Sequence, residues 1–81
     1  MHNVTHAVGT LEIVQRLPSS KLGNPRFLIR VDGWTCRTGV DSLIAYVIEG
    51  LEGRHVEATI GTYYGVSTLN SLHYSNHLNG G

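Results

Sequence analysis

The chain has 81 residues, of which 41% are hydrophobic and 15% are charged, and its formal net charge is zero. This length fits one domain, and this composition is typical of a globular protein rather than a disordered chain. The single cysteine excludes an internal disulfide, no apolar run reaches the roughly 18 residues of a membrane helix, and the N-terminus lacks the pattern of a signal peptide, so we expect a cytoplasmic protein.

The first predicted element is a long strand over residues 4–17 that changes phase near its middle. Val4 and Val8 belong to one phase of alternation, whereas the apolar residues from Leu11 onward follow the other. Gly9 lies where the phase changes, which predicts a β-bulge that bends the strand. A long, bent first strand is what a small closed barrel needs.

Residues 26–38 predict a β-hairpin with two chemically different faces. Asp32-Gly33 is the turn signal, because a type I′ turn needs positive φ at both central residues. Such a turn places Val31 opposite Trp34, and cross-strand partners share one face of the sheet. The predicted core face consists of Phe27, Ile29, Val31, Trp34 and Cys36. The opposite, basic face carries Arg26, Leu28, Arg30, Thr35 and Arg37.

Residues 40–53 predict a helix after the hairpin. Asp41 is a suitable N-cap, because its carboxylate can accept from the free N–H groups of the first turn. Gly50 and Gly53 are suitable terminators. The apolar residues at helical spacing are Leu43, Ile44, Val47, Ile48 and Leu51.

The remaining sequence predicts two strands and a tail. Residues 54–60 alternate, a glycine-bracketed turn follows over residues 61–65, and residues 66–74 form a final strand. We therefore expect one domain over residues 4–74, followed by a flexible C-terminal tail over residues 75–81.

The predicted order of elements is strand, strand, strand, helix, strand, strand. It indicates a mainly β fold: a small five-stranded OB-like barrel with one helix between strands three and four. The alternative is a β-grasp-like α+β fold. That fold also fits the order of elements over residues 26–60, and the chain ends in Gly80-Gly81, as ubiquitin-like modifiers end in Gly-Gly.

Several short motifs lie between residues 24 and 69. They are Asn24-Pro25-Arg26-Phe27, Val31-Asp32-Gly33, Thr35, Arg37-Thr38, Asp41-Ser42, Ala45-Tyr46, Val56, Gly65-Val66 and Leu69. Together they resemble a pattern in small uncharacterised proteins of actinobacterial phages. The resemblance implies a phage-encoded protein in the host cytoplasm, and it carries no activity or catalytic residue.

OB domains bind ligands on the outer face of strands two and three, between the loops that join strands one to two and four to five. The candidate nucleic-acid-binding residues in those places are Lys21, Arg26, Arg30, Arg37, Tyr63 and Tyr64. Cations neutralise phosphates, and aromatic rings stack on bases for about 1–3 kcal/mol each. The alternative is structural: arginines keep an exposed sheet face in solution, and tyrosines cover a barrel end.

The charges are unevenly spread. Residues 13–40 hold five basic residues and one acidic residue, a net charge of +4, whereas the rest of the chain carries −4. This pattern favours a narrow site for single-stranded nucleic acid over general coating. The alternative function is a phage-encoded interaction or self-assembling factor that acts on a host protein, with Leu28 as the apolar centre of its surface, and either reading allows a homo-oligomer.

No catalytic, metal or cofactor site is predicted, and we expect a protein that is not an enzyme. His2 and His6 are four residues apart, as are His73 and His77. On a strand this spacing separates the two rings by about 13 Å, too far for one ion. Cys36 falls on the predicted core face, where a cysteine behaves as a small hydrophobic residue.

Overall fold

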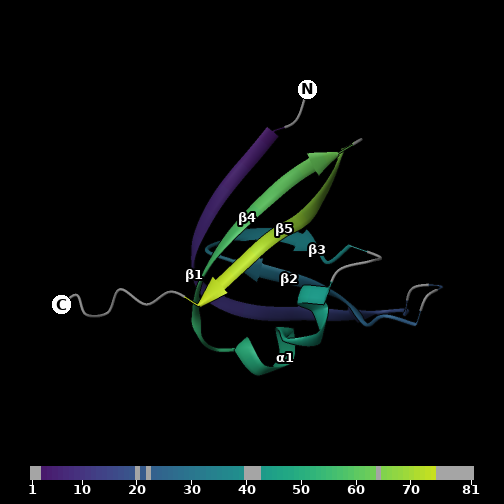
Figure 1. The fold of residues 1–81 in the computed structure, drawn as a ribbon. Coiled ribbons are helices and arrows are strands. Elements are labelled where there is room, and N and C mark those ends of the chain that lie inside the picture. The colour runs from purple at the N-terminus through teal and green to yellow at the C-terminus, as the bar shows by residue number, and fades with distance from the viewer. Residues whose placement is uncertain (1–2, 20, 22, 40–42, 64, 75–81) are drawn as a thin grey trace.

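The computed structural model describes residues 3–19, 21, 23–39, 43–63 and 65–74. Its elements are β1 (Asn3–Leu17), β2 (Arg26–Val31), β3 (Trp34–Arg37), the 3-10 helix η1 (Leu43–Tyr46), α1 (Ile48–Leu51), β4 (His55–Tyr63) and β5 (Val66–Tyr74) (Figure 1). The predicted tail over residues 75–81 lies outside the described residues. Among the described residues, no helix has the length and hydropathy needed to span a membrane.

The five strands close into a barrel in the order β1-β2-β3-β5-β4. β1 belongs to both halves of the ring, because it pairs with β4 through residues 3–10 and with β2 from Leu11 onward. The closure between β3 and β5 is parallel and consists of one pair, Arg37 with Thr68. The predicted mainly β fold, a small five-stranded barrel with a helical segment between strands three and four, is confirmed. The closed ring decides against the β-grasp-like alternative.

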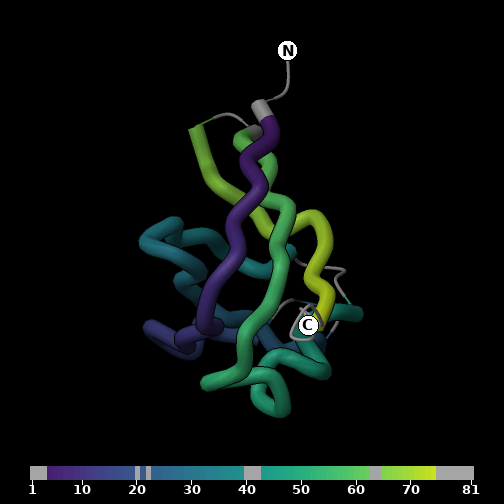
Figure 2. The backbone as a smooth tube through the Cα atoms, turned by 90° about the vertical axis from the view of Figure 1, so that its left-hand side faces the viewer, coloured from purple at the N-terminus to yellow at the C-terminus, as the bar shows by residue number. Residues whose placement is uncertain are grey.

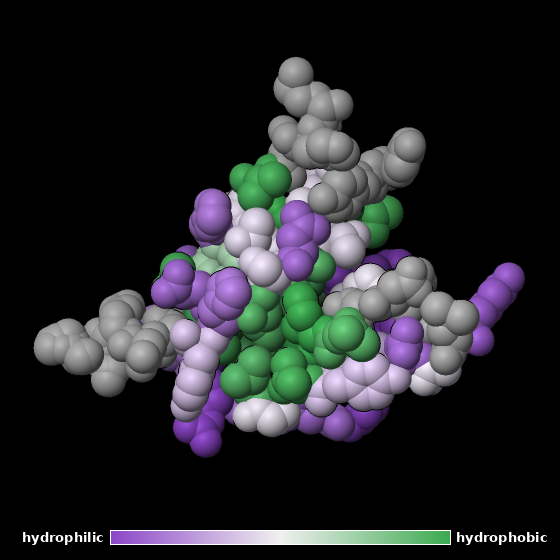
Figure 3. Space-filling model, viewed as in Figure 1, coloured by the Kyte–Doolittle hydropathy of each residue, from purple (hydrophilic) through white to green (hydrophobic). Residues whose placement is uncertain are grey.

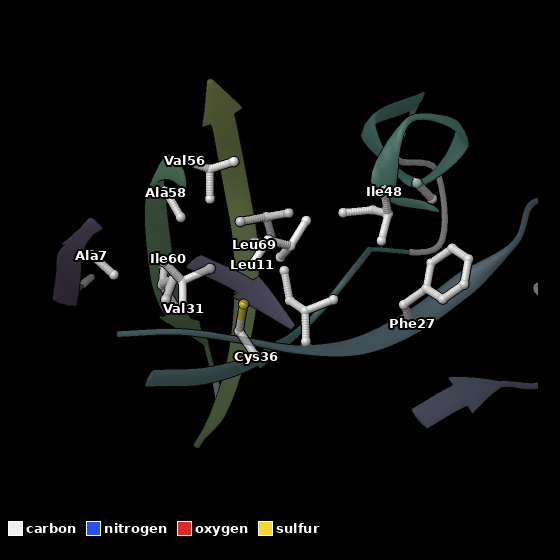
Figure 4. Close-up of a cluster of buried hydrophobic side chains, with 12 residues drawn as sticks. Ala7, Leu11, Phe27, Val31, Cys36, Ile48, Val56, Ala58, Ile60 and Leu69 are labelled. Carbon is white, nitrogen blue, oxygen red and sulfur yellow. The ribbon is translucent and has the colours of Figure 1, made fainter. Parts of the chain in front are cut away.

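The core lies inside this ring, and the helical segment covers one end of it. Along β2, residues alternate strictly between partly exposed and buried. Figure 4 shows Ile48 of α1 on the same side of the cluster as Phe27, away from Ala7. The buried cluster consists of Ala7, Leu11, Phe27, Ile29, Val31, Cys36, Ala45, Ile48, Val56, Ala58, Ile60 and Leu69.

The hairpin between β2 and β3 has the predicted turn but not the complete predicted core face. Asp32 and Gly33 have φ values of 50° and 80°, and Val31 pairs with Trp34. The prediction of Trp34 as a core residue is wrong, because Trp34 is 51% exposed. Trp34 directly follows the turn, at the end of the ring, so sharing a face with Val31 does not bring it under cover.

The predicted bulge at Gly9 is also wrong. The register of β1 with β4 runs without a break from Asn3 to Thr10, and the inward phase continues from Ala7 to Leu11. The irregularity lies instead around Val14, between the positions that pair with β2. Gly9 lies on the inward phase of β1, and the hairpin turn at Asp32 approaches it closely.

The helical segment is shorter than predicted. It consists of the 3-10 turn η1 and the four-residue α1, and the predicted N-cap Asp41 lies outside the described residues. Gly50 lies inside α1 rather than ending it, whereas Gly53 has a φ of 83°, as a terminating residue requires. The predicted apolar face is only partly buried, since Leu43 is 77% exposed.

The strands β4 and β5 form a longer hairpin than predicted. β4 continues through Gly61 to Tyr63, where the sequence predicted a turn, and Tyr63 pairs with Val66 at the start of β5. Gly65 has a φ of 78°, which fits a tight reversal next to β5. The β-branched Thr62 and the aromatic Tyr63 are typical strand residues and extend the ladder beyond Gly61.

Candidate functional site

The outer face of β2 and β3 gathers the three predicted arginines. Arg26 and Arg30 alternate with buried residues along β2, so they point away from the core. Arg37 of β3 pairs with Leu28, which lies between the two arginines of β2. Thr35, which pairs with Arg30, completes the basic face of Arg26, Leu28, Arg30, Thr35 and Arg37.

Arg30 lies at the centre of the sheet and has an acidic neighbour that the sequence reasoning did not place there. Its Nη1 is 3.7 Å from Oε1 of Glu12, the residue that pairs with it on β1. Both side chains are substantially exposed, at 43% and 61%, so the attraction is worth at most about 1 kcal/mol. The signal for this contact is the register of β1 with β2, because that register places Glu12 opposite Arg30.

Arg26 lies near the edge of the basic face, opposite Leu17 of β1. Its Nε is buried and has no hydrogen-bond partner among the described residues. A buried N–H without a partner is uncommon and destabilising, and a bound anion is one way to satisfy it. Arg37 is exposed and makes no ion pair with the described residues.

The predicted site also includes three loop residues, Lys21, Tyr63 and Tyr64. Lys21 is exposed in the loop between β1 and β2. Tyr64 and the side chain of Tyr63 lie outside the described residues, so their predicted stacking role remains a prediction. The backbone brings their hairpin near the basic face, because Thr68 of β5 pairs with Arg37.

Arg16 lies near the basic face but is engaged elsewhere. It forms an ion pair with Glu49 of α1, and its guanidinium carbon lies 5.3 Å from the centroid of the Phe27 ring. These contacts join the end of β1 to the helical segment. Arg16 therefore acts as a structural residue, outside the predicted site.

The described residues offer no metal site and no activated thiol. No group of three metal-ligating side chains occurs among them, and His2 and His77 lie outside the described residues. Cys36 is 1% exposed, and burial raises the pKa of its thiol from the ordinary value of 9.0 to about 11. At neutral pH this thiol is protonated and inaccessible. Its burial confirms the prediction that Cys36 lies on the core face.

A second surface was missed by the sequence reasoning. Leu43, Tyr46 and Val47 are 77%, 59% and 52% exposed, although Leu43 and Val47 belong to the apolar residues at helical spacing. Figure 3 shows apolar side chains gathered over the helical segment and the adjoining part of β5. Exposed apolar patches of this kind often mark protein contacts.

No known protein family, curated protein or solved structure matches the chain. The basic face and the exposed apolar surface are the two candidate binding surfaces of the described residues.

Proposed function

We propose that this protein is a small, non-enzymatic module that binds single-stranded nucleic acid weakly on the basic face. The observation that carries the proposal is the convergence of Arg26, Arg30 and Arg37 on one side of two adjacent strands. Arg37 and the buried Nε of Arg26 have no charged partner among the described residues, which leaves both for an anionic ligand. Leu28 between them provides an apolar surface for a base or a sugar.

The arginines of the basic face are spaced to contact several phosphates of a nucleic-acid backbone rather than a single anion. Arg30 and Arg37 are diagonal neighbours across the β2–β3 ladder, which places their Cα atoms about 7–8 Å apart. Three phosphate contacts on a single strand predict a slope of about −2 in a plot of log affinity against log salt concentration. Glu12 beside Arg30 weakens the local positive potential, so we expect the binding to be weak.

The test is fluorescence anisotropy of a labelled oligothymidine at low and high salt. Arg30→Ala combined with Arg37→Ala is expected to weaken binding equally for all base sequences, because phosphate contacts carry no sequence information. The matched control is Arg54→Ala, since Arg54 contacts Tyr74 on another part of the barrel. Glu12→Gln is expected to tighten binding. Absence of binding at low salt in the wild-type protein would overturn the proposal.

The second candidate function is binding of a host protein, and the exposed apolar surface of the helical segment favours it. Leu43 and Val47 are largely exposed, so burial in the core does not explain why these two positions are apolar. The resemblance to phage proteins supports a host partner and a location in the host cytoplasm. A host protein retained from lysate after nuclease treatment, and lost with Leu43→Ser, would support this function. Loss of all partners upon nuclease treatment would favour nucleic acid.

A further inference from the structure

The first half of β1 forms an open edge of the sheet. Among the described residues, only β4 pairs with residues 3–10, and β2 joins β1 from Leu11 onward. Figure 2 shows the first half of β1 running alongside β4. One side of the backbone over residues 3–8 therefore presents N–H and C=O groups that no described strand pairs.

This edge lacks the devices that usually protect edge strands. Residues 3–10 include no charged residue and no proline, and their register with β4 is uninterrupted. β5, which pairs with β3 only at Thr68 among the described residues, contains a bulge at Asn70, between the partners of Thr59 and Ile60. A bulge disrupts a ladder and discourages further pairing, so β1 is the better template for an added strand.

The side chains of this edge are compatible with antiparallel pairing to the same residues of a second copy of the chain. Val4 and Val8 are 52% and 44% exposed, and both lie on the outer face, evenly spaced about His6. In an antiparallel pair with a two-fold axis at His6, Val4 of each copy lies opposite Val8 of the other. Two β-branched pairs thus form without any charged residue at the junction, and the zero net charge of the chain opposes association little.

We propose that the protein forms a symmetric dimer through antiparallel pairing of residues 3–8 of β1 with the same residues of a second copy. The sheet formed by β5, β4 and β1 then continues across the dimer as six strands. The basic face lies on β2 and β3 and is not used in this contact. The dimer therefore stands or falls independently of nucleic-acid binding.

Sedimentation velocity over a concentration series measures the association. Val4→Lys and Val8→Lys are each expected to raise the dissociation constant at least about tenfold, because the symmetry introduces each lysine twice. Val14→Lys is the matched control, since Val14 lies on the same strand at 42% exposure but outside the edge. Circular dichroism confirms that each variant is folded.

Two further measurements locate the contact. Amides of residues 3–8 are expected to exchange hydrogen more slowly as the concentration rises. His6→Cys is expected to cross-link into a covalent dimer under mild oxidation, whereas Val14→Cys is not, because only a residue at the axis faces its own copy. Buried Cys36 does not compete.

A wild-type protein that stays monomeric up to submillimolar concentration overturns the proposal. So does a dimer that Val8→Lys leaves intact, or one that Val14→Lys weakens equally. A dimer that is lost with Leu43→Lys but retained with Val8→Lys would assign the contact to the apolar surface of the helical segment instead.

Discussion

The turn of the β2–β3 hairpin rests against β1 at Gly9. A Cβ built on Gly9 would lie 3.2 Å from the Cβ of Asp32 and 3.3 Å from its backbone nitrogen. These distances are shorter than ordinary van der Waals contacts. Gly9 lies just before the point where β1 leaves β4 and begins to pair with β2 at Leu11. Because Gly9 has no side chain, the β2–β3 turn can pack against β1 where the strand changes partner from β4 to β2.

The first prediction concerns this contact. Gly9→Ala is expected to lower the free energy of unfolding by about 1–3 kcal/mol, because the turn backbone must move to admit a methyl group. Gly50→Ala is the control: Gly50 lies in α1 with open space around it, and alanine is expected to raise stability by up to about 1 kcal/mol. Urea denaturation measures both. Equal effects of the two substitutions would contradict the proposed role of Gly9.

The second prediction concerns the hairpin turn itself. Gly33 has a φ of 80°, and a Cβ there meets no atom within 4 Å. Gly33→Ala therefore destabilises the protein through backbone strain and not through a side-chain clash. We expect a loss of about 1–2 kcal/mol. Asp32→Asn is expected to keep or increase stability, because asparagine is favoured at the first position of a type I′ turn. A neutral Gly33→Ala in thermal denaturation would argue against this turn conformation.

The third prediction concerns the closing pair of the hairpin. The Phe27 N–H donates to Oγ1 of Thr38 and the Thr38 N–H donates to the Phe27 carbonyl, both at 3.0 Å, and Thr38 is buried. Thr38→Val keeps the shape but leaves a buried N–H unpaired, which costs about 1–3 kcal/mol. Thr35→Val, at an exposed position on β3, is expected to change stability by less than about 0.5 kcal/mol. Chemical denaturation of the two variants in parallel decides.

The fourth prediction follows from the raised pKa of Cys36. Well below pH 9 the thiol is protonated in the folded and the unfolded chain, so it adds no pH dependence. Between pH 9 and about 11 the unfolded chain loses this proton while the folded protein keeps it. Cys36 therefore lowers the free energy of unfolding by up to about 1.4 kcal/mol per pH unit in that window.

Cys36→Ala isolates this effect from the other groups that titrate at alkaline pH. The difference in unfolding free energy between the wild-type protein and the variant, measured at pH 8 and pH 10 by urea denaturation, should shrink at the higher pH. A difference independent of pH would show that the folded thiol titrates like an exposed one.

The hairpin was predictable from the sequence because its determinants are local. Asp32-Gly33 fixes the turn, the turn fixes the register, and the register separates Phe27 and Ile29 from the arginines. The gathering of the basic face followed from the same argument. The exposure of Trp34 did not follow from this argument, because it depends on which other elements cover the end of the barrel.

The errors elsewhere arise from tertiary effects. The phase change at Gly9 predicts a bulge, but Gly9 accommodates a turn that is distant in the sequence. The helical spacing after β3 was real, yet only short turns form, and Leu43 stays exposed. The pairing of Glu12 with Arg30 needed the order of the strands in the barrel. Local patterns do not contain that order.

The division of β1 between two partners has a consequence for the folding pathway. The hairpins β2–β3 and β4–β5 join neighbours in the sequence and can form within microseconds. Val4, by contrast, pairs with Gly61, so the ring cannot close until nearly the whole chain has been synthesised and its ends brought together. Contacts between such distant residues slow folding. We expect the first half of β1 to dock last and the closing of the ring to set the folding rate.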